Sequence, residues 1–394
     1  RFALFWLLMV AVHGAQGQNQ ANNWYFGDHA GITFNFGSPP VALTGSAMNT
    51  DEGCSTISDG NGNLLFYTDG ATVWNRNHTV MFNGTGLFGS FSSTQSSVAI
   101  PKPGSNRFFY LFTVPAYPQN PGGLCYSLID MQLDGGLGGI VVGEKNIMLQ
   151  LDVTEKLTAV KHANNTDIWV MTHERNNNIF DAFLITSSGL NTIAVKSISG
   201  SNHGSGMSNM GYMKASPNGV HIACALHSPA NFVELFDFNS STGVVSNPIK
   251  FNNYSDPYGL EFSPNSQLMY FGTLSGGGSL YQADLSSGNS TIIQASLVQV
   301  ANLGLALAAL QIGPDGKLYV INPYEPYLHQ IHNPNSVGSV NYTVNAISLS
   351  GNYANLGLPT FIQSYFNPVP FNHTHTCFGD TTEFVPEITT GIDS

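Results

Sequence analysis

Charge is scarce in this chain. Only 9% of its 394 residues are charged, and 24 acidic residues against 12 basic ones give a formal net charge of −12. The basic residues form no run that would follow a phosphate backbone, so we do not expect nucleic acid as a partner. The acidic excess is spread along the sequence, and its simplest consequence is solubility.

Cysteine is scarce as well. The four cysteines, Cys54, Cys125, Cys224 and Cys377, show no Cys-x-x-Cys or Cys/His spacing typical of a zinc site. The first three fall in strand-like stretches, where a buried free thiol is expected. Because an exported chain can also form disulfides, the pairing of all four stays open.

Long apolar runs and clean helical periodicity are missing beyond the N-terminus. Residues 2–12 form an apolar run behind Arg1, and a small-x-small sequence follows at 15–17. This pattern is typical of a signal peptide and is too short for a comfortable transmembrane span. We therefore interpret 1–17 as a signal peptide and 18–21 as a short leader, and we expect a secreted or cell-surface protein without a transmembrane segment.

Glycine and a repeated strand–turn–strand phrase are abundant. The chain has 42 glycines, and the clearest copies of the phrase occupy residues 213–224, 260–270 and 310–320. In each copy an apolar run enters a turn rich in Pro, Asn, Asp and Gly, and an aromatic or β-branched run leaves it. Looser copies lie at 55–67, 98–110 and 159–170. Repetition about every fifty residues is typical of a β-propeller with WD40-like repeats.

Counting the copies predicts an all-β fold with seven blades over residues 22–368. The stretch 357–366 reads as a seventh innermost strand without following strands of its own, and the strand-like runs at 24–27 and 30–36 have no preceding partner. We expect N- and C-terminal strands to close one blade together, because closure removes the exposed edges of an open ring. Uneven spacing of the copies leaves six or eight blades open.

Residues 369–394 differ in composition from the repeats. We interpret them as a linker followed by the start of a β-sandwich module that this sequence does not complete.

Several ordered phrases of the sequence carry a resemblance to a known family. They are 23–34, 52–59, 63–75, 155–162, 231–238 and 356–366 in the predicted propeller, and 377–384 after it. These phrases resemble those of a family of secreted bacterial surface proteins. In that family an N-terminal propeller precedes immunoglobulin-like PKD modules and a type IX secretion sorting domain, and its members are usually labelled gliding-motility-associated or PKD-domain-containing. The resemblance implies a surface or released protein of a gliding-type Gram-negative bacterium, exported through a C-terminal domain outside this sequence. It implies no defined ligand.

Polar and apolar residues alternate in the innermost strands. Alignment on the turns places Thr56, Lys214, Glu261 and Gln311 at one equivalent position, with apolar residues beside them. Because alternate residues of a strand face opposite ways, we expect this polar set to face the central channel. Either it forms a solvated channel wall, or it binds a polar ligand or ion on the axis.

Residues that enter the innermost strands are expected on the rim of the ring. Glu52 and Lys156 have two open interpretations: an internal salt bridge that fixes the blades, which we favour, and contact with a ligand. Tyrosines near the rim either form a sugar-stacking platform or, as is commoner, pack between blades. The rim candidates are Asp51, Glu52, Gln95, Glu155, Lys156, Asp256 and Tyr258, and the tyrosines are Tyr212, Tyr258, Tyr324, Tyr327 and Tyr353.

Asp59, Asn61 and Asn63 reproduce the start of a calcium loop, but Leu64 and Gly70 replace the glycine and the bidentate glutamate that such a loop requires. We therefore predict a turn, with calcium as the alternative, and no other cofactor.

These observations favour a non-catalytic binding or adhesion module at the head of a multidomain surface protein. Its expected partner is an extracellular polysaccharide or a surface protein. The alternatives are a glycoside hydrolase or polysaccharide lyase that uses paired carboxylates or a lysine near the channel, and a purely structural cap. No catalytic residue and no metal ligand is assigned. The candidate ligand-binding residues are Glu52, Gln95, Lys156, Lys214, Tyr258, Glu261 and Gln311.

Overall fold

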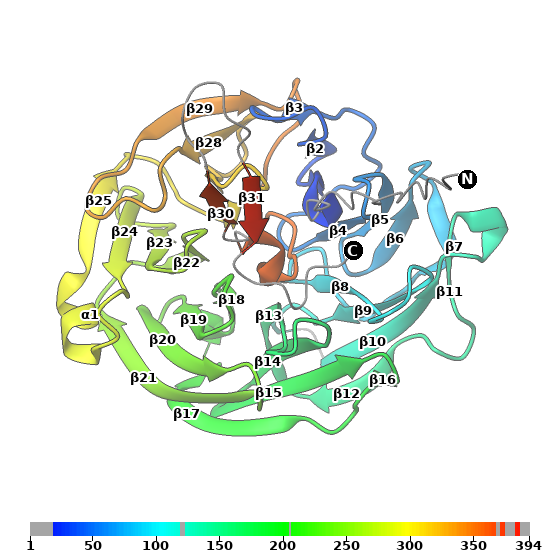
Figure 1. Ribbon diagram of the computed structural model, residues 1–394, viewed down its shortest axis with the longest axis horizontal. Coiled ribbons are helices and arrows are strands. Elements are labelled where there is room, and N and C mark those ends of the chain that lie inside the picture. The colour runs from blue at the N-terminus through cyan, green and yellow to red at the C-terminus, as the bar shows by residue number, and fades with distance from the viewer. Residues whose placement is uncertain (1–18, 119–122, 205, 368–370, 375–382, 387–394) are drawn as a thin grey trace, which may run out of the picture.

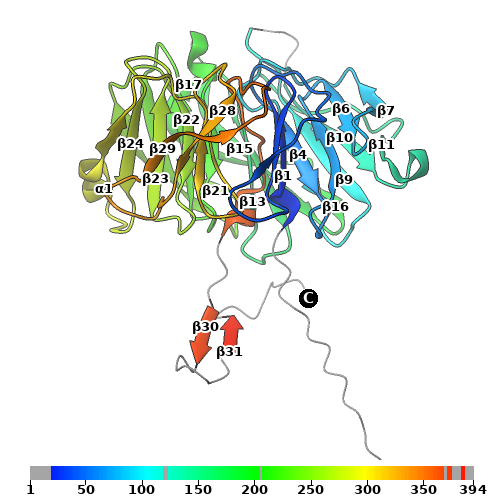
Figure 2. The same cartoon turned by 90° about the horizontal axis from the view of Figure 1, so that it is seen from above.

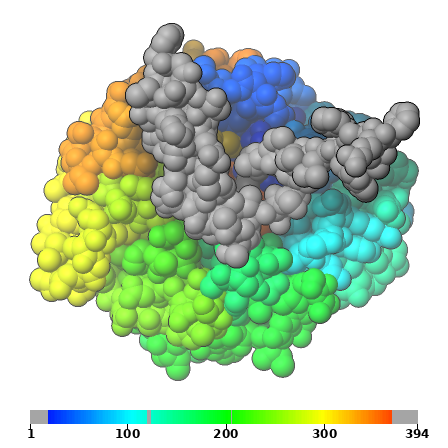
Figure 3. All heavy atoms as spheres, in the orientation of Figure 1, coloured from blue at the N-terminus to red at the C-terminus, as the bar shows by residue number. Residues whose placement is uncertain are grey.

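The computed structural model describes residues 19–118, 123–204, 206–367, 371–374 and 383–386. Their strands follow one another around a central axis as seven blades, which confirms the predicted all-β propeller (Figure 1). In Figure 3 the colours succeed one another around a disc, so blades that are neighbours in sequence are neighbours in space. The interpreted signal peptide, residues 1–17, lies outside the described residues.

The first blade has three strands, and every later blade has four or five. Blade 1 contains β1 (Asn23–Phe26), β2 (Ala30–Thr33) and β3 (Val41–Ala42). Blade 2 contains β4 (Ser55–Ser58), β5 (Leu64–Thr68), β6 (Thr72–Asn75) and β7 (Val80–Thr85). Blade 3 contains β8 (Ser97–Pro101), β9 (Phe108–Thr113), β10 (Gly123–Asp130), the 3-10 helix η2 (Asp134–Gly136), β11 (Gly139–Ile140) and β12 (Ile147–Leu151). Parallel pairing of β7 with β11 joins blades 2 and 3 at their outer edges.

The remaining blades are separate sheets. Blade 4 contains β13 (Val153–Lys161), β14 (Ile168–Glu174), β15 (Asn177–Thr186), β16 (Gly189–Leu190) and β17 (Val195–His203). Blade 5 contains β18 (Met213–Ala215), β19 (His221–Leu226), β20 (Phe232–Asn239) and β21 (Val244–Asn252). Blade 6 contains β22 (Pro257–Phe262), β23 (Leu268–Thr273), β24 (Ser279–Asp284), the helix α1 (Ser290–Ser296) and β25 (Val298–Asn302). Blade 7 contains β26 (Leu310–Ile312), β27 (Leu318–Val320), β28 (Tyr327–Ile331) and β29 (Tyr342–Ser348).

A serine-capped turn explains why the repeated phrase recurs. Ser216 Oγ accepts hydrogen bonds from the backbone N–H groups of Val220 and His221, at 3.2 and 2.9 Å. Gly219 closes the turn with a φ of +71°, a conformation that glycine adopts without a Cβ penalty. In blade 6, Ser263 Oγ accepts from Leu268 N at 2.9 Å in the same way. The phrase therefore encodes the tight link between the first and second strands of a blade.

Both ends of the chain close the ring between blades 7 and 1, as predicted. Asp28 and Tyr353 form an antiparallel bridge. The segment that follows lies along the axis, where Pro359 bridges to Cys54 and Ile362 bridges to Ala159, both in parallel orientation. It makes these isolated bridges and the 3-10 helix η4 (Gln363–Phe366) rather than one continuous strand.

The closing segment fills the centre of the ring, where Figure 1 shows it in orange. Eleven of the thirteen residues from 354 to 366 are buried and the other two are partly buried, and the ring centroids of Phe361 and Trp24 in blade 1 lie 5.9 Å apart. Gly357 is required by close approach, because a Cβ there would lie 1.9 Å from the backbone oxygen of Glu52. The axis is consequently occupied by protein.

The innermost strands run in one direction, so the loops that precede them share one face with the turns between second and third strands. We call this the entry face; it is the upper face in Figure 2. In blades 2 to 7 the turns between first and second strands lie on the opposite face. In blade 1, β1 runs the other way, because Asn23 at its start bonds to Ser58 at the far end of β4. The turn between β1 and β2 therefore lies on the entry face, where Asp28 bridges to Tyr353. Residues on the entry face can therefore form a common site with one another, but not with residues on the opposite face.

Smaller features complete the fold. The 3-10 helix η1 (Asn19–Ala21) joins blade 2 through a hydrogen bond from Asn19 Nδ2 to the Gly60 oxygen, so the ordered fold includes leader residues that we expected outside it. Cys54, Cys125 and Cys224 are buried free thiols, as expected, and Cys377 lies outside the described residues. Strands β30 (Phe371–Thr374) and β31 (Glu383–Pro386) pair in a two-stranded sheet. Within the described ranges, no helix is long and apolar enough to cross a membrane.

Candidate functional site

Two buried glutamates lie at the entry end of the axis. Glu52 precedes β4 and Glu155 belongs to β13, with exposed fractions of 7% and 1%. The backbone N–H and the hydroxyl of Thr94 each donate to Glu155 Oε2 at 2.8 Å, and Tyr117 N donates to its Oε1 at 2.8 Å. The Tyr258 hydroxyl donates to Glu52 Oε2 at 3.1 Å. Loop residues thus hold the carboxyl group of Glu155, and strand β22 of blade 6 supplies the partner of Glu52.

Burial changes the acidity of this pair. It is the main cause that raises the pKa of Glu52 to about 8, and repulsion from Glu155 acts in the same direction. Burial also raises the pKa of Glu155, although hydrogen bonds from Tyr117 and Thr94 oppose that shift. At neutral pH, Glu52 therefore carries a proton that a general acid would need.

Lys156 does not form the predicted salt bridge with Glu52. Its Nζ donates to the backbone oxygens of Met210 and Asn209, at 2.8 and 3.0 Å, and lies 3.4 Å from that of Ser208. These carbonyls follow from the 3-10 helix η3 (Gly206–Asn209), whose last oxygens have no partner within the helix. Complete burial lowers the pKa of Lys156 to about 8. The buried ammonium fixes a loop of blade 5 onto blade 4.

Gln95 connects three blades. Its Oε1 accepts from Met213 N at 2.7 Å and from Leu157 N at 3.3 Å, and its Nε2 donates to Met213 O at 3.0 Å. Its side chain thus bonds to both blade 4 and blade 5, and the residue is fully buried. The structure gives Gln95 a packing role.

Lys214, Glu261 and Gln311 meet in one layer deeper along the axis, as the turn alignment predicts. Lys214 Nζ lies 3.0 Å from Glu261 Oε2 and also donates to Gln311 Oε1. None of the three is more than 1% exposed, and Thr56 in the same layer is equally buried. The expectation of a water-lined wall is wrong for these residues, because the closing segment fills the axis. Burial lowers the pKa of Lys214 and raises that of Glu261, against the effect of their pairing.

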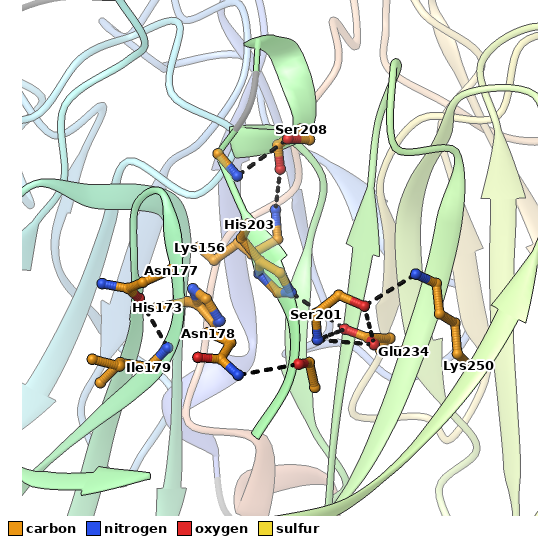
Figure 4. A network of polar contacts seen from close by, with 12 residues as sticks. Lys156, His173, Asn177, Asn178, Ile179, Ser201, His203, Ser208, Glu234 and Lys250 are labelled. Atoms are coloured by element: carbon orange, nitrogen blue, oxygen red, sulfur yellow. Dashed lines mark hydrogen bonds and ion pairs between the residues drawn. The ribbon is translucent and has the colours of Figure 1, made fainter. Parts of the chain in front are cut away.

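A pair of stacked histidines was not anticipated as a unit. His173 in β14 and His203 at the end of β17 have ring centroids 3.6 Å apart, inclined by 12° (Figure 4). His203 Nε2 lies 3.5 Å from Glu234 Oε2, which belongs to the neighbouring blade. Burial lowers the pKa of both histidines, so both are neutral. The sequence carries no signal for this contact, because pairing of β14 and β17 with β15 creates it.

The candidate tyrosines divide into two groups. Tyr212 and Tyr258 are buried and pack edge to face, with centroids 5.7 Å apart. Tyr324 and Tyr353 are 62% and 45% exposed and lie on the entry face, and Tyr327 is partly buried. Of the five tyrosines predicted as a stacking platform, only Tyr324 and Tyr353 are exposed enough to stack on a ligand. The other three are buried or partly buried in the propeller.

The calcium-like sequence forms a turn, as predicted. Asp59 Oδ1 accepts from the backbone N–H groups of Asn61 and Asn63, both at 2.9 Å, and its Oδ2 accepts from Asn63 Nδ2 at 3.0 Å. Its carboxylate is thus used within the turn. In the part of the chain that the structure describes, no three His, Cys, Asp or Glu side chains are grouped to hold a metal ion.

Comparison with known proteins adds the following. No family model matches the chain, and no curated protein does. Solved structures similar to it include a 6-phosphogluconolactonase-like protein from Bacteroides uniformis, at 17% identity over 82% of this chain and 87% of that chain, with a TM-score of 0.42. Another is the periplasmic gluconolactonase of Pseudomonas aeruginosa, at 14% identity over 73% and 82%, with a TM-score of 0.48. The propeller assignment rests on the strand order of this chain itself.

Proposed function

We propose that this chain is an extracellular binding module whose entry face engages a polysaccharide or a surface protein. The observation that carries the proposal is the contrast between enclosed ionisable groups on the axis and free aromatic rings on the entry face. Glu52, Lys156, Lys214 and Glu261 are at most 7% exposed, and hydrogen bonds within the protein hold each of them. A catalytic group must reach its substrate, and these side chains are enclosed.

The entry face offers contact area instead. Tyr324, Tyr353 and Phe91 lie in its loops and are 62%, 45% and 50% exposed. Aromatic side chains of this kind provide large contact area at low cost in conformational entropy. A ligand could bind to these exposed rings without any change in the structure of the entry face.

A glycoside hydrolase or polysaccharide lyase is the second candidate, and the Glu52–Glu155 pair favours it. One protonated and one hydrogen-bonded carboxyl group form the acid and base set of such enzymes. Both carboxyl groups are buried, and the N–H of Tyr117 already occupies Glu155 Oε1, so a substrate does not reach them in this conformation. The structure therefore supports this candidate less well than binding.

The family resemblance of the sequence supports a proposal about the position of this module in a longer protein and about its export. We propose that it stands at the head of a longer surface protein and that the type IX secretion machinery exports it. Mass spectrometry of the secreted protein tests this: its N-terminus should lie at residue 18, and deletion of a sorting domain downstream should stop its release.

The experiment that separates binding from catalysis is a glycan panel combined with a reducing-end assay on every glycan retained. Retention of intact glycan, unchanged in a Glu52→Gln variant, supports the binding module. Release of reducing ends that Glu52→Gln abolishes would establish the enzyme and overturn the proposal.

A further inference from the structure

Five residues gather on the entry face where the ring closes. We call them the closure cluster: Asp28, His29, Tyr324, Glu325 and Tyr353. Asp28 and His29 form the turn between β1 and β2, Tyr324 and Glu325 lie between β27 and β28, and Tyr353 follows β29. Segments from the first and the last blade therefore meet there.

The backbone beneath the cluster is held firmly. Asp28 N donates to Tyr353 O at 2.9 Å, and Tyr324 N donates to Ala354 O at 2.7 Å. Ala354 N donates in turn to Glu325 O at 3.0 Å. Loops that are ordered before a ligand arrives lose little entropy on binding. The cluster is thus a pre-organised surface.

Three of the five side chains above this backbone are free of polar and ring contacts in the described part of the chain. Tyr324 and Tyr353 are 62% and 45% exposed, and Glu325 is exposed. Within the described ranges these three side chains make no hydrogen bond, ion pair or ring contact. The side chains of Asp28 and His29 are 44% and 50% exposed, with Asp28 Oδ1 3.6 Å from His29 Nε2. His29 Nδ1 lies 2.8 Å from the backbone oxygen of Ser46. Two aromatic faces and two carboxylates are therefore available to a ligand.

Tyr324 also has a strained backbone conformation. Its φ is +63°, in the left-handed region that bulky residues avoid and that glycine or asparagine adopts more readily. No packing partner among the described residues accounts for its ring. Strained residues of this kind cluster at binding sites, where the surroundings hold them in place.

Charge restricts the ligand. Residues 19–75 contain no Lys or Arg, and neither do residues 318–394. Lys317 is the nearest basic residue of blade 7 in sequence, and it lies in the turn on the opposite face, 3.5 Å from Asp315. An anionic sugar would meet two carboxylates here, and the one basic side chain of the cluster, His29, already contacts Asp28. A neutral sugar would find carboxylate oxygens that accept hydrogen bonds from its hydroxyl groups.

We propose that the closure cluster is a subsite for a neutral saccharide. One or both tyrosine rings stack on the apolar face of a sugar ring, and the carboxylates of Asp28 and Glu325 accept hydrogen bonds from its hydroxyl groups. A five-residue patch suits one or two sugar rings, whereas a stable protein interface buries about 800 Å² on each partner. The inference rests on the proposed binding function and names its ligand class and site.

The test is isothermal titration of the full chain with neutral β-glucan and mannan oligosaccharides, and with alginate and heparin oligosaccharides as anionic probes. The variants are Tyr324→Asn, which keeps a residue tolerant of positive φ, and Tyr353→Ala. Each should weaken binding of the neutral ligand about tenfold, because stacking on an aromatic ring is lost. The matched control is Phe36→Ala, since Phe36 is 80% exposed and follows β2 toward the opposite face.

The outcomes separate this inference from the function on which it rests. Neutral-glycan binding that both tyrosine variants weaken and Phe36→Ala does not supports the subsite. Undiminished binding by folded tyrosine variants, or binding of anionic glycans alone, overturns the subsite and leaves the binding module. Capture of a surface protein without any glycan binding does the same. Cleavage of the glycan overturns the proposed function itself.

Discussion

The axis and the closure cluster use similar residues in opposite ways. On the axis, Glu52, Tyr258, Lys214 and Glu261 are enclosed and bonded to one another or to loops of other blades. At the closure cluster, the side chains of Glu325, Tyr324 and Tyr353 are exposed and make no polar contact within the described ranges, although hydrogen bonds hold their backbone. A carboxylate or a tyrosine in a propeller is therefore no sign of a ligand site by itself. Its partners and its exposure decide between a structural and a binding role.

The largest effect should come from breaking the axis. Lys214→Met leaves Glu261 buried without its cation, and loss of one partner of a buried pair costs about 3–5 kcal/mol of unfolding free energy. Urea unfolding measures this. Lys317→Met, in a partly exposed pair, is the matched control and should cost about 1 kcal/mol or less. Equal effects of the two variants would show that the axis is open to water.

The next effect is a dependence of stability on pH. The pKa of Glu52 is about 8 in the folded protein and near its usual value of 4.5 in the unfolded chain, so the folded state binds more protons between pH 4.5 and 8. The contribution of Glu52 is complete below pH 4.5 and is lost as pH rises through 8, by roughly 3–5 kcal/mol.

Comparison with Glu52→Gln isolates this contribution. Glutamine cannot ionise, so the difference in unfolding free energy between the two proteins should change across pH 5 to 8 in the direction that favours the variant at higher pH. A pH-independent difference would mean that the Glu52 carboxyl group is solvated.

A smaller effect concerns the strained tyrosine. Tyr324→Gly removes the ring and relieves the positive φ, so the unfolding free energy should rise by about 1 kcal/mol while affinity for the neutral glycan falls. Thermal unfolding and titration of the same sample measure both. Loss of stability would show that the Tyr324 ring packs on the protein after all.

The smallest effect should follow from Tyr353→Phe. This change keeps the ring and removes only a hydroxyl group that is unpaired in the described structure, so affinity should change by about threefold or less. Titration beside Tyr353→Ala measures it. A loss as large as that of Tyr353→Ala would move recognition from the ring face to the hydroxyl group.

The layer of Lys214, Glu261 and Gln311 was predictable because the repeated turn sets a common register for the innermost strands. The partner of Lys156 was not. The ladder between β13 and β14 shifts register between Val153 and Leu157, and such an irregularity breaks the alternation on which a prediction of side-chain direction depends. The stacked His173 and His203 come from strands that only a shared neighbour brings together.

The sequence by itself determined the architecture: a periodic phrase with a serine-capped turn predicts seven blades, and unmatched strands at both ends predict closure. It also named most polar residues near the axis. Only the tertiary structure shows that these residues are buried and hydrogen-bonded within the protein. Their burial depends on the closing segment that fills the centre, and no local sequence pattern encodes what lies opposite a side chain. For the same reason, only the folded ring shows that Tyr324 and Tyr353 remain free while Tyr212 and Tyr258 are buried.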